Sequence, residues 1–449
     1  MDKLSIRIVF LGALVGLMAS VLVILFRLSI ELLQVGWLPG GVVGNYEALP
    51  DWLHFALPLG GALLLGLAFN YLPPPMRAVG VVHVLEFLRF RKQRLPFRNA
   101  LVQFAGGWLA IISGQSVDRE GPGVHLGAAN AALLGRRFKL QEDEDYLLAA
   151  AGGAAAIAAA YNTPLAGVIF VIEVFRLRYA INAIVPVIVA TVMGAVISQL
   201  VFGSNPAFDV PPLSIGSLAE LPVIAGMGLL IGLLASLFIL MINRIARFTI
   251  EWQPLVMFPV AGLVTGILAL WAPAIMGISY DALNRIFQQQ LGFQALALLL
   301  FAKFVATAVS VGARMPGGLI GPSLMLGGAV GGIIEYLVAG QWSSFQGSAG
   351  FYALTGMVAM MGAVLHAPLA ALVALMELTG NLNIILPGMI VVVSAEVVTR
   401  SLIGDQSAFT TLLVVKHERE ARQMAAQAQL VAEAAARKAE TDTSEKQDG

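Results

Sequence analysis

The sequence lacks cysteine and carries very little charge. None of its 449 residues is cysteine, which excludes disulfides, thiolate metal sites and a cysteine nucleophile. Charged residues make up 12% and hydrophobic residues 58% of the chain, whereas a soluble globular chain has about 25% charged residues. The 27 basic and 27 acidic residues balance, so no net positive field attracts nucleic acid. These absences exclude a soluble enzyme, a disordered chain and a nucleic-acid-binding protein, and they predict a helical protein that crosses a membrane several times.

The apolar segments differ in length along the chain. Residues 5–33 and 52–72 are long enough to cross a bilayer, which takes about 20 residues in a helix. Others, such as 79–87, 164–175 and 368–378, are too short to span. Short apolar segments interrupted by Gly or Pro are typical of half-helices whose tips line a site inside the protein. The sequence therefore predicts an all-α, polytopic membrane protein with broken and re-entrant helices.

Basic residues follow the second predicted span. Two spans return the chain to the side from which it started, and there it meets a group of basic side chains: Arg77, Arg89, Arg91, Lys92, Arg94 and Arg98. The positive-inside rule makes this side cytoplasmic, and hence the N-terminus as well. We expect a multi-pass protein of a bacterial inner membrane with both termini in the cytoplasm.

Two patterns occur twice at nearly the same offset. The Gly-Pro pair at 121–122 recurs at 321–322, an offset of 200. A Pro-Leu-Ala triplet begins nine positions before Glu173, and another begins nine positions before Glu377, an offset of 204. Because both patterns recur in the same order, they indicate two related halves. Duplicated halves with broken helices are typical of secondary transporters and of some channels.

The Gly-Pro pairs predict helices that begin inside the protein. Proline is tolerated in the first turn of a helix, because the N–H groups there have no partner within the helix. Free N–H groups and the positive end of the helix dipole together make a site for an anion. Two such starts, one from each half, can converge on one anion without a buried Lys or Arg. A full positive charge would hold the anion too tightly for passage.

The domain organisation follows from the repeat and from the tail. We place a membrane domain at residues 1–415, with the first repeat at about 50–205 and the second at about 220–413. Charge returns in residues 416–449, which hold 13 of the 54 charged residues. Their spacing predicts a cytoplasmic helix, and we expect residues 441–449 to be disordered.

Four segments resemble the characteristic motifs of the ClC family of chloride channels and chloride/proton antiporters. They are SGQSVDREGPGVHLG, MPGGLIGPSLMLG, AYNTPLAGVIFVIE and LHAPLAALVALMELTGN, and the resemblance extends over about residues 11–413. It implies inverted repeats and a homodimer with a separate pore in each subunit. The expected partners are a small anion such as chloride, protons and the lipid bilayer. We expect no enzyme activity, no cofactor and no bound metal.

The resemblance also assigns roles to individual residues. Glu120 matches the gating glutamate, whose carboxylate sits in the external anion site and must be protonated or move aside for an anion to pass. Leu319 and Ile320 match the pair whose backbone N–H groups contact the central anion. Gly80 and Gly121 belong to the same expected set of anion-binding positions.

Three departures from the family pattern concern the anion and the proton. Val79 stands where the anion-coordinating serine lies in the family, and Phe409 where the anion-coordinating tyrosine lies. A hydrogen bond to a charged partner contributes about 1.5–3 kcal/mol, so losing both hydroxyls should weaken the central site by about 10- to 100-fold or more. Val174 replaces the internal proton-transfer glutamate. Its neighbour Glu173 recurs as Glu377, which favours a capping role over a proton path.

Other positions are open to more than one reading. Asp118 stands where the family motif begins with glycine, and we expect it and Arg119 in a vestibule or a local ion pair. Gln103 replaces a buried lysine. Lys303 suits a vestibule and a membrane interface equally well. His83 is the last residue of the segment AVGVVH, which stands where the family has the motif that contains its anion-coordinating serine.

Three functions remain open. The leading prediction is a ClC-type anion channel that is gated by voltage or pH through Glu120. The alternative is a loosely coupled chloride/proton antiporter, which would need a proton route that avoids Val174. The third reading is an intramembrane enzyme. Its nearest catalytic set is Ser113, Ser116 and His125, which the anion motif explains better.

Overall fold

The computed structural model describes residues 6–90, 94–177, 180–204, 208, 216–339 and 348–445, with only the backbone at 339, 430–432 and 434–445. The α-helices of this part are α1 (Ile6–Trp37), α2 (Asp51–Tyr71), α3 (Gly80–Phe90), α4 (Phe97–Ile112), α5 (Glu120–Arg137), α6 (Glu142–Tyr161), α7 (Pro164–Glu173), α8 (Ile181–Phe202), α9 (Leu221–Phe248), α10 (Pro254–Ala269), α11 (Tyr280–Phe287), α12 (Phe293–Gly312), α13 (Ile320–Ala339), α14 (Phe351–Leu365), α15 (Pro368–Thr379), α16 (Ile385–Ile403) and α17 (Ala408–Glu445). Short 3-10 helices lie at Pro39–Gly41, Tyr46–Ala48, Pro74–Arg77, Leu218–Glu220, Pro273–Ile275 and Leu382–Ile384. Apart from one isolated bridge, these described residues contain no β-structure.

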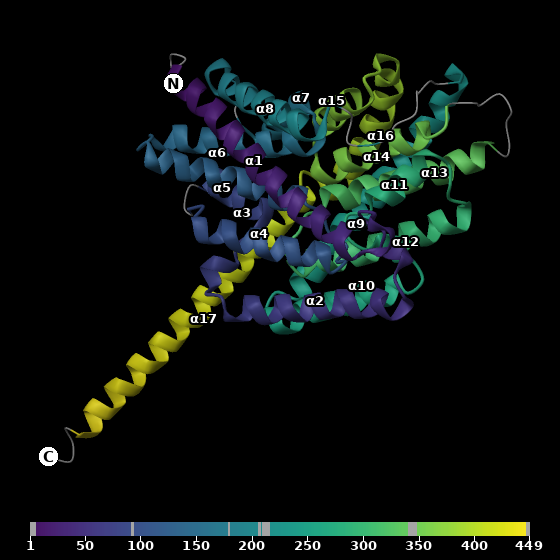
Figure 1. Ribbon diagram of the computed structural model, residues 1–449. Coiled ribbons are helices and arrows are strands. Elements are labelled where there is room, and N and C mark those ends of the chain that lie inside the picture. The colour runs from purple at the N-terminus through teal and green to yellow at the C-terminus, as the bar shows by residue number, and fades with distance from the viewer. Residues whose placement is uncertain are drawn as a thin grey trace.

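The helices repeat in order. α1 to α8 correspond to α9 to α16, and α1 packs on α8 as α9 packs on α16. The two halves also meet directly, because α2 packs on α10 and α7 on α15. Figure 1 shows most of the first half, in purple to blue, beside most of the second half, in green. The first half thus includes α1, which lies before our predicted start at about residue 50.

The helices differ in length as the sequence predicts. Among the described residues, seven helical segments are long and apolar enough to cross a membrane. In contrast, α7, α10, α14 and α15 are apolar but have only 10, 16, 15 and 12 residues. The fold class, an all-α membrane protein with broken helices, is confirmed.

Glycines let the helices of each half approach closely. A Cβ atom on Gly127 of α5 would lie 2.3 Å from the carbonyl oxygen of Gly152 on α6. At the corresponding crossing of α13 and α14, a Cβ on Gly327 would lie 2.2 Å from the carbonyl oxygen of Gly356. Small residues at crossings are how helices associate in a membrane. The two crossings therefore hold the helices that begin at the Gly-Pro pairs.

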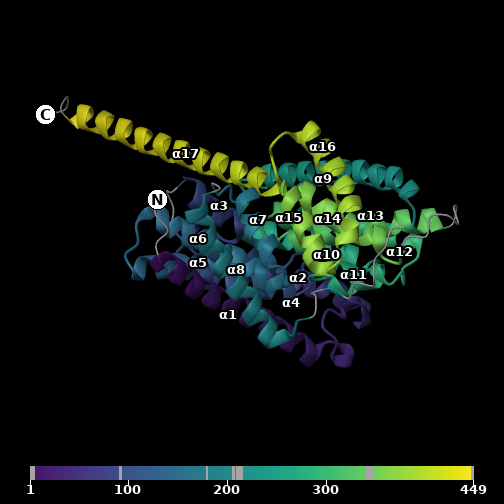
Figure 2. The same cartoon turned by 90° about the horizontal axis from the view of Figure 1, so that it is seen from above.

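The C-terminal helix runs without interruption from the membrane body into the tail. α17 begins inside the body and projects beyond it (Figures 1 and 2), so our domain boundary at 416 falls within a helix. The helix includes residues 441–445, where we expected disorder. The preceding stretch is rich in alanine and has neither Gly nor Pro, so the helix continues. Residues 446–449, and two members of the basic group, Arg91 and Lys92, lie outside the described residues.

Candidate anion pathway

Two helices begin at the same point of the molecule. α5 starts at Glu120 and α13 at Ile320, and an antiparallel bridge joins Asp118 to Gly318 just before them. The backbone N–H of Asp118 donates to the carbonyl of Gly318 at 3.2 Å, and the return bond is 3.3 Å. Positions 118 and 318 are equivalent in the repeat. Both helices thus begin where the two halves meet, and the positive ends of their dipoles lie close together.

The Asp118 carboxylate lies between the two helix starts. Its Oδ1 accepts the backbone N–H of Gly121 at 3.0 Å, and its Oδ2 accepts that of Gly321 at 2.7 Å. The backbone N–H of Ile320 faces the same carboxylate. A vestibule or ion-pair position for Asp118 is therefore wrong, because the side chain is fully buried among backbone donors. Gly318 leaves the room for it, since a Cβ there would lie 1.9 Å from Oδ1.

The Glu120 carboxylate is also buried, but it has other partners. Its Oε1 accepts the hydroxyl of Tyr280 at 2.7 Å, and that hydroxyl lies 2.8 Å from the hydroxyl of Tyr161. Arg119 Nε lies 3.6 Å from Oε1, whereas Oε2 has no partner among the described residues. The resemblance implies a Glu120 carboxylate in the external anion site. In this structure the Glu120 carboxylate accepts a hydrogen bond from the Tyr280 hydroxyl. The carboxylate of Asp118 accepts the backbone N–H groups at the two helix starts.

Two residues of this site escaped the sequence reasoning. Tyr161 comes from α6 and lies within the segment AYNTPLAGVIFVIE, but we assigned it no role. Tyr280 comes from α11 and lies outside the four motifs. One signal was available, since Tyr280 starts α11 exactly 200 positions after Gly80 starts α3. Arg119 does form the expected local ion pair, with Nη1 at 2.9 Å from Oε1 of Glu31.

A cavity of about 600 Å³ brings together four of the predicted anion-binding residues: Val79, Gly80, Leu319 and Phe409. Five basic side chains also line it: Arg77, Arg94, Arg314, Lys416 and Arg419. A wall with this charge raises the local concentration of anions. Apart from Glu120, which bonds to Tyr280, the predicted anion-binding positions thus fall into two groups. One group lines this cavity, and the other, Gly121 and Ile320, faces Asp118.

Gln103 and Lys303, at equivalent positions of the two halves, hold neighbouring segments. Gln103 Oε1 accepts the backbone N–H of Gly80 at 2.5 Å, so this N–H, which we expected to face the anion, already has a partner. Lys303 is fully buried, and its Nζ donates to three oxygens: those of Ile275, Gly277 and the Ser279 hydroxyl. Neither expected position of Lys303, in a vestibule or at a membrane interface, is correct.

Comparison with known proteins identifies the family. The model of the family described as voltage gated chloride channel matches residues 61–400. This chain belongs to the ClC family. With its apolar helices, membership makes it an integral, multi-pass membrane protein.

Relatives of this ClC protein cover nearly its whole length. A protein of Ralstonia nicotianae whose name describes it as a ClcB-like chloride channel protein is 30% identical over 399 residues. The match covers 86% of this chain and 92% of the relative. The protein of Vibrio cholerae named H(+)/Cl(-) exchange transporter ClcA is 28% identical and covers 92% and 90%. The crystal structure of a slow cyanobacterial Cl-/H+ antiporter superimposes with a TM-score of 0.78 at 24% identity, covering 92% and 98%, and supports the same fold.

Two buried histidines of the ClC protein form a pair. His83 on α3 lines the cavity, and its Nδ1 lies 3.0 Å from Nε2 of His125 on α5. The rings stack, with centroids 5.2 Å apart. Nδ1 of His125 has no partner among the described residues. The pair therefore reaches from the cavity to the helix that begins at Glu120.

The expected proton-path residues, Glu173 and Val174, lie at the C-terminal end of α7, and oxygen atoms of both accept hydrogen bonds. The carboxylate of Glu173 accepts the backbone N–H groups of Leu369 and Ala370 at 3.0 and 2.8 Å. Val174 is buried and apolar, and its carbonyl accepts Arg89 at 3.2 Å. Neither residue offers a free acid, so a proton route through this part of the ClC protein needs other groups.

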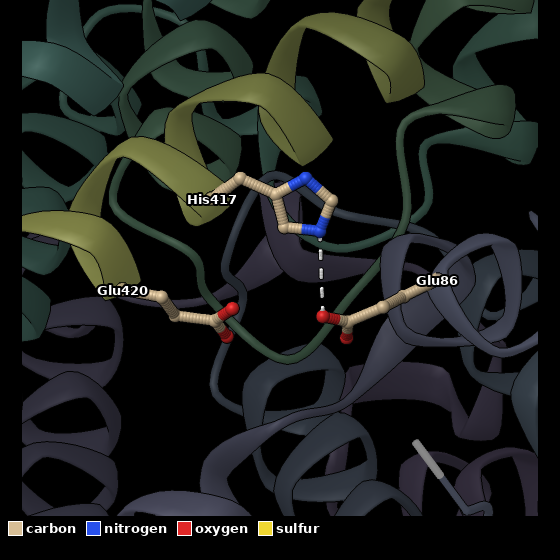
Figure 3. Close-up of side chains that lie close together, drawn as sticks. All are labelled: Glu86, His417 and Glu420. Atoms are coloured by element: carbon tan, nitrogen blue, oxygen red, sulfur yellow. Dashed lines mark ion pairs between the residues drawn. The ribbon is translucent and has the colours of Figure 1, made fainter. Parts of the chain in front are cut away.

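Three side chains of the types that can bind a metal lie close together where α17 passes α3. Figure 3 shows Glu86, His417 and Glu420, whose ligand atoms lie within 4.8 Å of one another. Lys416 pairs with Glu86 and lies 3.8 Å from Glu420, and His417 lies 3.6 Å from Glu86. The lysine already neutralises the carboxylate that a metal would need. These contacts instead hold the tail helix against the membrane body.

The enzyme reading finds no assembled serine–histidine set among the described side chains. Ser116 Oγ lies 2.8 Å from the hydroxyl of Thr307, and Ser113 donates to the carbonyl of Ala110 at 3.1 Å. His125 bonds to the other histidine of its pair. Each candidate residue thus has a separate hydrogen-bond partner. The family to which the chain belongs is described as chloride channels, and its relatives include a protein named as an exchange transporter.

Proposed function

We propose that this ClC protein exchanges chloride for protons across the membrane. The observation that carries the proposal is the buried Glu120 carboxylate, which lies beside two converging helix starts and keeps one oxygen without a partner. An ionisable group in such a place is a functional group by default. The exchange transporter of Vibrio cholerae, a relative over nearly the whole chain, supports exchange more strongly than the channel that was our leading prediction.

Chloride would enter the cavity that Val79, Leu319 and Phe409 line, drawn by its basic walls. Beyond this cavity it would meet the N–H groups at the starts of α5 and α13. Glu120 would take up a proton on Oε2 and become neutral, which weakens its attraction to Arg119 and lets an anion approach. Deprotonation would restore the charge, and the next anion would have to wait for the next proton.

For the inner part of the proton route we propose the His83–His125 pair in place of Val174. A neutral imidazole takes up a proton at one ring nitrogen and releases one from the other. His83 is reached from the cavity, and the 3.0 Å contact links it to His125. His125 lies five residues after Glu120 on α5, which corresponds to about 7.5 Å along the helix axis.

The test measures proton movement driven by chloride. Purified protein is reconstituted into lipid vesicles loaded with chloride, the voltage is held near zero with a potassium ionophore, and external chloride and pH are recorded together. We expect chloride efflux to draw protons into the vesicles. Glu120→Gln, which has the same size but takes up no proton, is the matched control and should lose the proton movement. Chloride efflux without protons in the parent protein would support the channel instead, and no efflux of any anion would contradict transport.

We further propose that the protein is a homodimer in a bacterial inner membrane with both termini in the cytoplasm. The resemblance to the ClC family and the basic group around Arg77 and Arg94 support this. The mass of the protein in a lipid nanodisc, after subtraction of lipid and scaffold, should be twice the 47.4 kDa of one chain. A mass of one chain would contradict the dimer.

A further inference from the structure

We propose that Asp118 is a built-in substitute for the transported anion. Its carboxylate fills the anion site that the starts of α5 and α13 form, and an anion binds there only after this carboxylate has moved out. The proposal rests on the proposed anion transport, and it assigns to the site a blocking group other than Glu120.

The first argument is the set of donors. Each carboxylate oxygen accepts one backbone N–H, from Gly121 in the first half at 3.0 Å and from Gly321 in the second half at 2.7 Å. Both donors lie in the first turn of a helix, where N–H groups have no partner within the helix. These are the groups, and the dipole ends, that a small anion would use. Asp118 therefore uses the donors of the anion site itself.

The second argument is the shape of the site. A Cβ on Gly318 would lie 1.9 Å from Oδ1 of Asp118, and a Cβ on Gly321 would lie 2.9 Å from its Cβ. The space between the two halves thus holds this carboxylate only because both positions are glycine. The backbone of Asp118 is held by the two hydrogen bonds to Gly318. The carboxylate must then leave by rotation of its side chain, while the helix starts stay in place.

The third argument is the state of the neighbouring acid. Glu120 is buried as Asp118 is, but it bonds to a tyrosine hydroxyl and leaves Oε2 without a partner. A buried polar atom without a partner is rare and calls for an explanation. The two acids therefore have different roles in the proposed site. Asp118 competes with the anion for the helix amides, and Glu120 is free to exchange a proton.

A built-in competitor has a measurable effect on affinity. The apparent affinity of an anion is the intrinsic one multiplied by the fraction of molecules whose carboxylate is out of the site. If that fraction is about a tenth or less, removing the carboxylate tightens binding by about tenfold or more. The same change should speed chloride efflux from vesicles, because the blocking step is gone.

The experiment compares bromide binding in the parent protein, Asp118→Asn and Asp118→Gly by calorimetry, with chloride efflux measured on the same samples. Asp118→Gly empties the space, and Asp118→Asn keeps its volume but removes the charge and one acceptor oxygen. We expect both variants to bind bromide about tenfold more tightly or better. A crystal of either variant should show the anomalous signal of bromide next to the N–H groups of Gly121 and Gly321.

The outcomes separate this proposal from the proposed function. If the parent moves chloride but the folded variants bind bromide within about twofold of the parent, Asp118 is not a competitor and the proposal falls, while transport stands. If the variants bind bromide more tightly but the parent moves no chloride, the competitor stands and transport falls. Loss of folding in both variants, judged by gel filtration, would make Asp118 a structural cap and overturn the proposal.

Discussion

Glu173 and Glu377, at equivalent positions of the two halves, each cap the helix that carries the other. Glu173 ends α7 and accepts two N–H groups from the first turn of α15. Glu377, near the end of α15, accepts two from the first turn of α7, at 2.9 and 2.8 Å. The exchange requires the two helices to run antiparallel. The antiparallel orientation of these two corresponding helices is what inverted repeats predict.

This symmetry provides a matched pair of variants. Glu173→Ala and Glu377→Ala each remove a charged cap from one short helix, so we expect each to destabilise the protein by about 1–2 kcal/mol. The midpoint temperature of thermal unfolding in detergent should fall by a similar amount in both variants. Any change in proton movement in vesicles should be the same in the two variants. Selective loss of proton movement in Glu173→Ala would show that Glu173 carries protons and not only a cap.

Anion affinity should rise as the pH falls. Protonation of Asp118 removes the charge with which it competes for the helix amides. The ionisable groups that interact with it are Glu120 on α5, Tyr161 on α6, Tyr280 on α11 and Lys303 on α12. Protonation of Glu120 and Lys303 also favours an anion, so the contributions have one sign.

Calorimetry with bromide between about pH 8 and about pH 5 checks this direction. In Asp118→Asn the affinity should start higher and change less over the same range. An affinity that falls toward acid pH in the parent, or an unchanged slope in the variant, would contradict the prediction.

The cavity should bind anions more tightly when its missing hydroxyls are restored. Val79 and Phe409 both line it, and the N–H of Gly80 is taken by Gln103. Because donors are scarce there, Val79→Ser combined with Phe409→Tyr should strengthen chloride binding by about 10- to 100-fold. Each single variant should account for part of the gain. Unchanged affinity in calorimetry would mean that chloride does not bind at this level of the path.

The histidine pair should matter for protons and not for chloride. His125→Phe fills a similar space but breaks the 3.0 Å contact with His83. We expect proton movement in vesicles to slow by at least about tenfold, with bromide binding unchanged within about twofold. The same change at His54, which is buried and bonded to the carbonyl of Tyr46, is the matched control. Equal proton movement in His125→Phe and the parent would exclude the pair from the route.

Some features of the site are local and could be predicted. The Pro-Leu-Ala triplets mark helix starts, because proline is tolerated in a first turn, and α7 and α15 do begin at Pro164 and Pro368. The same reasoning placed helix starts near 121 and 321. The end of the tail could not be judged by composition. Its polar residues suggested disorder, but α17 extends to Glu445.

Other features depend on which segments of the two halves meet. In the sequence Asp118 is a polar residue just before a helix. Gly318 and Gly321, some 200 positions later, leave space for its side chain, and Gly321 also donates one of its two N–H bonds. Tyr280 likewise contacts Glu120 across 160 positions.

The sequence by itself determined the membrane, the repeat, the helix starts and the family, because apolar length, first-turn prolines and motif order are properties of short segments. Only the tertiary structure decided which carboxylate lies on the paired helix starts. That choice depends on the space and the donors that each half offers to the other, and no segment carries this information alone.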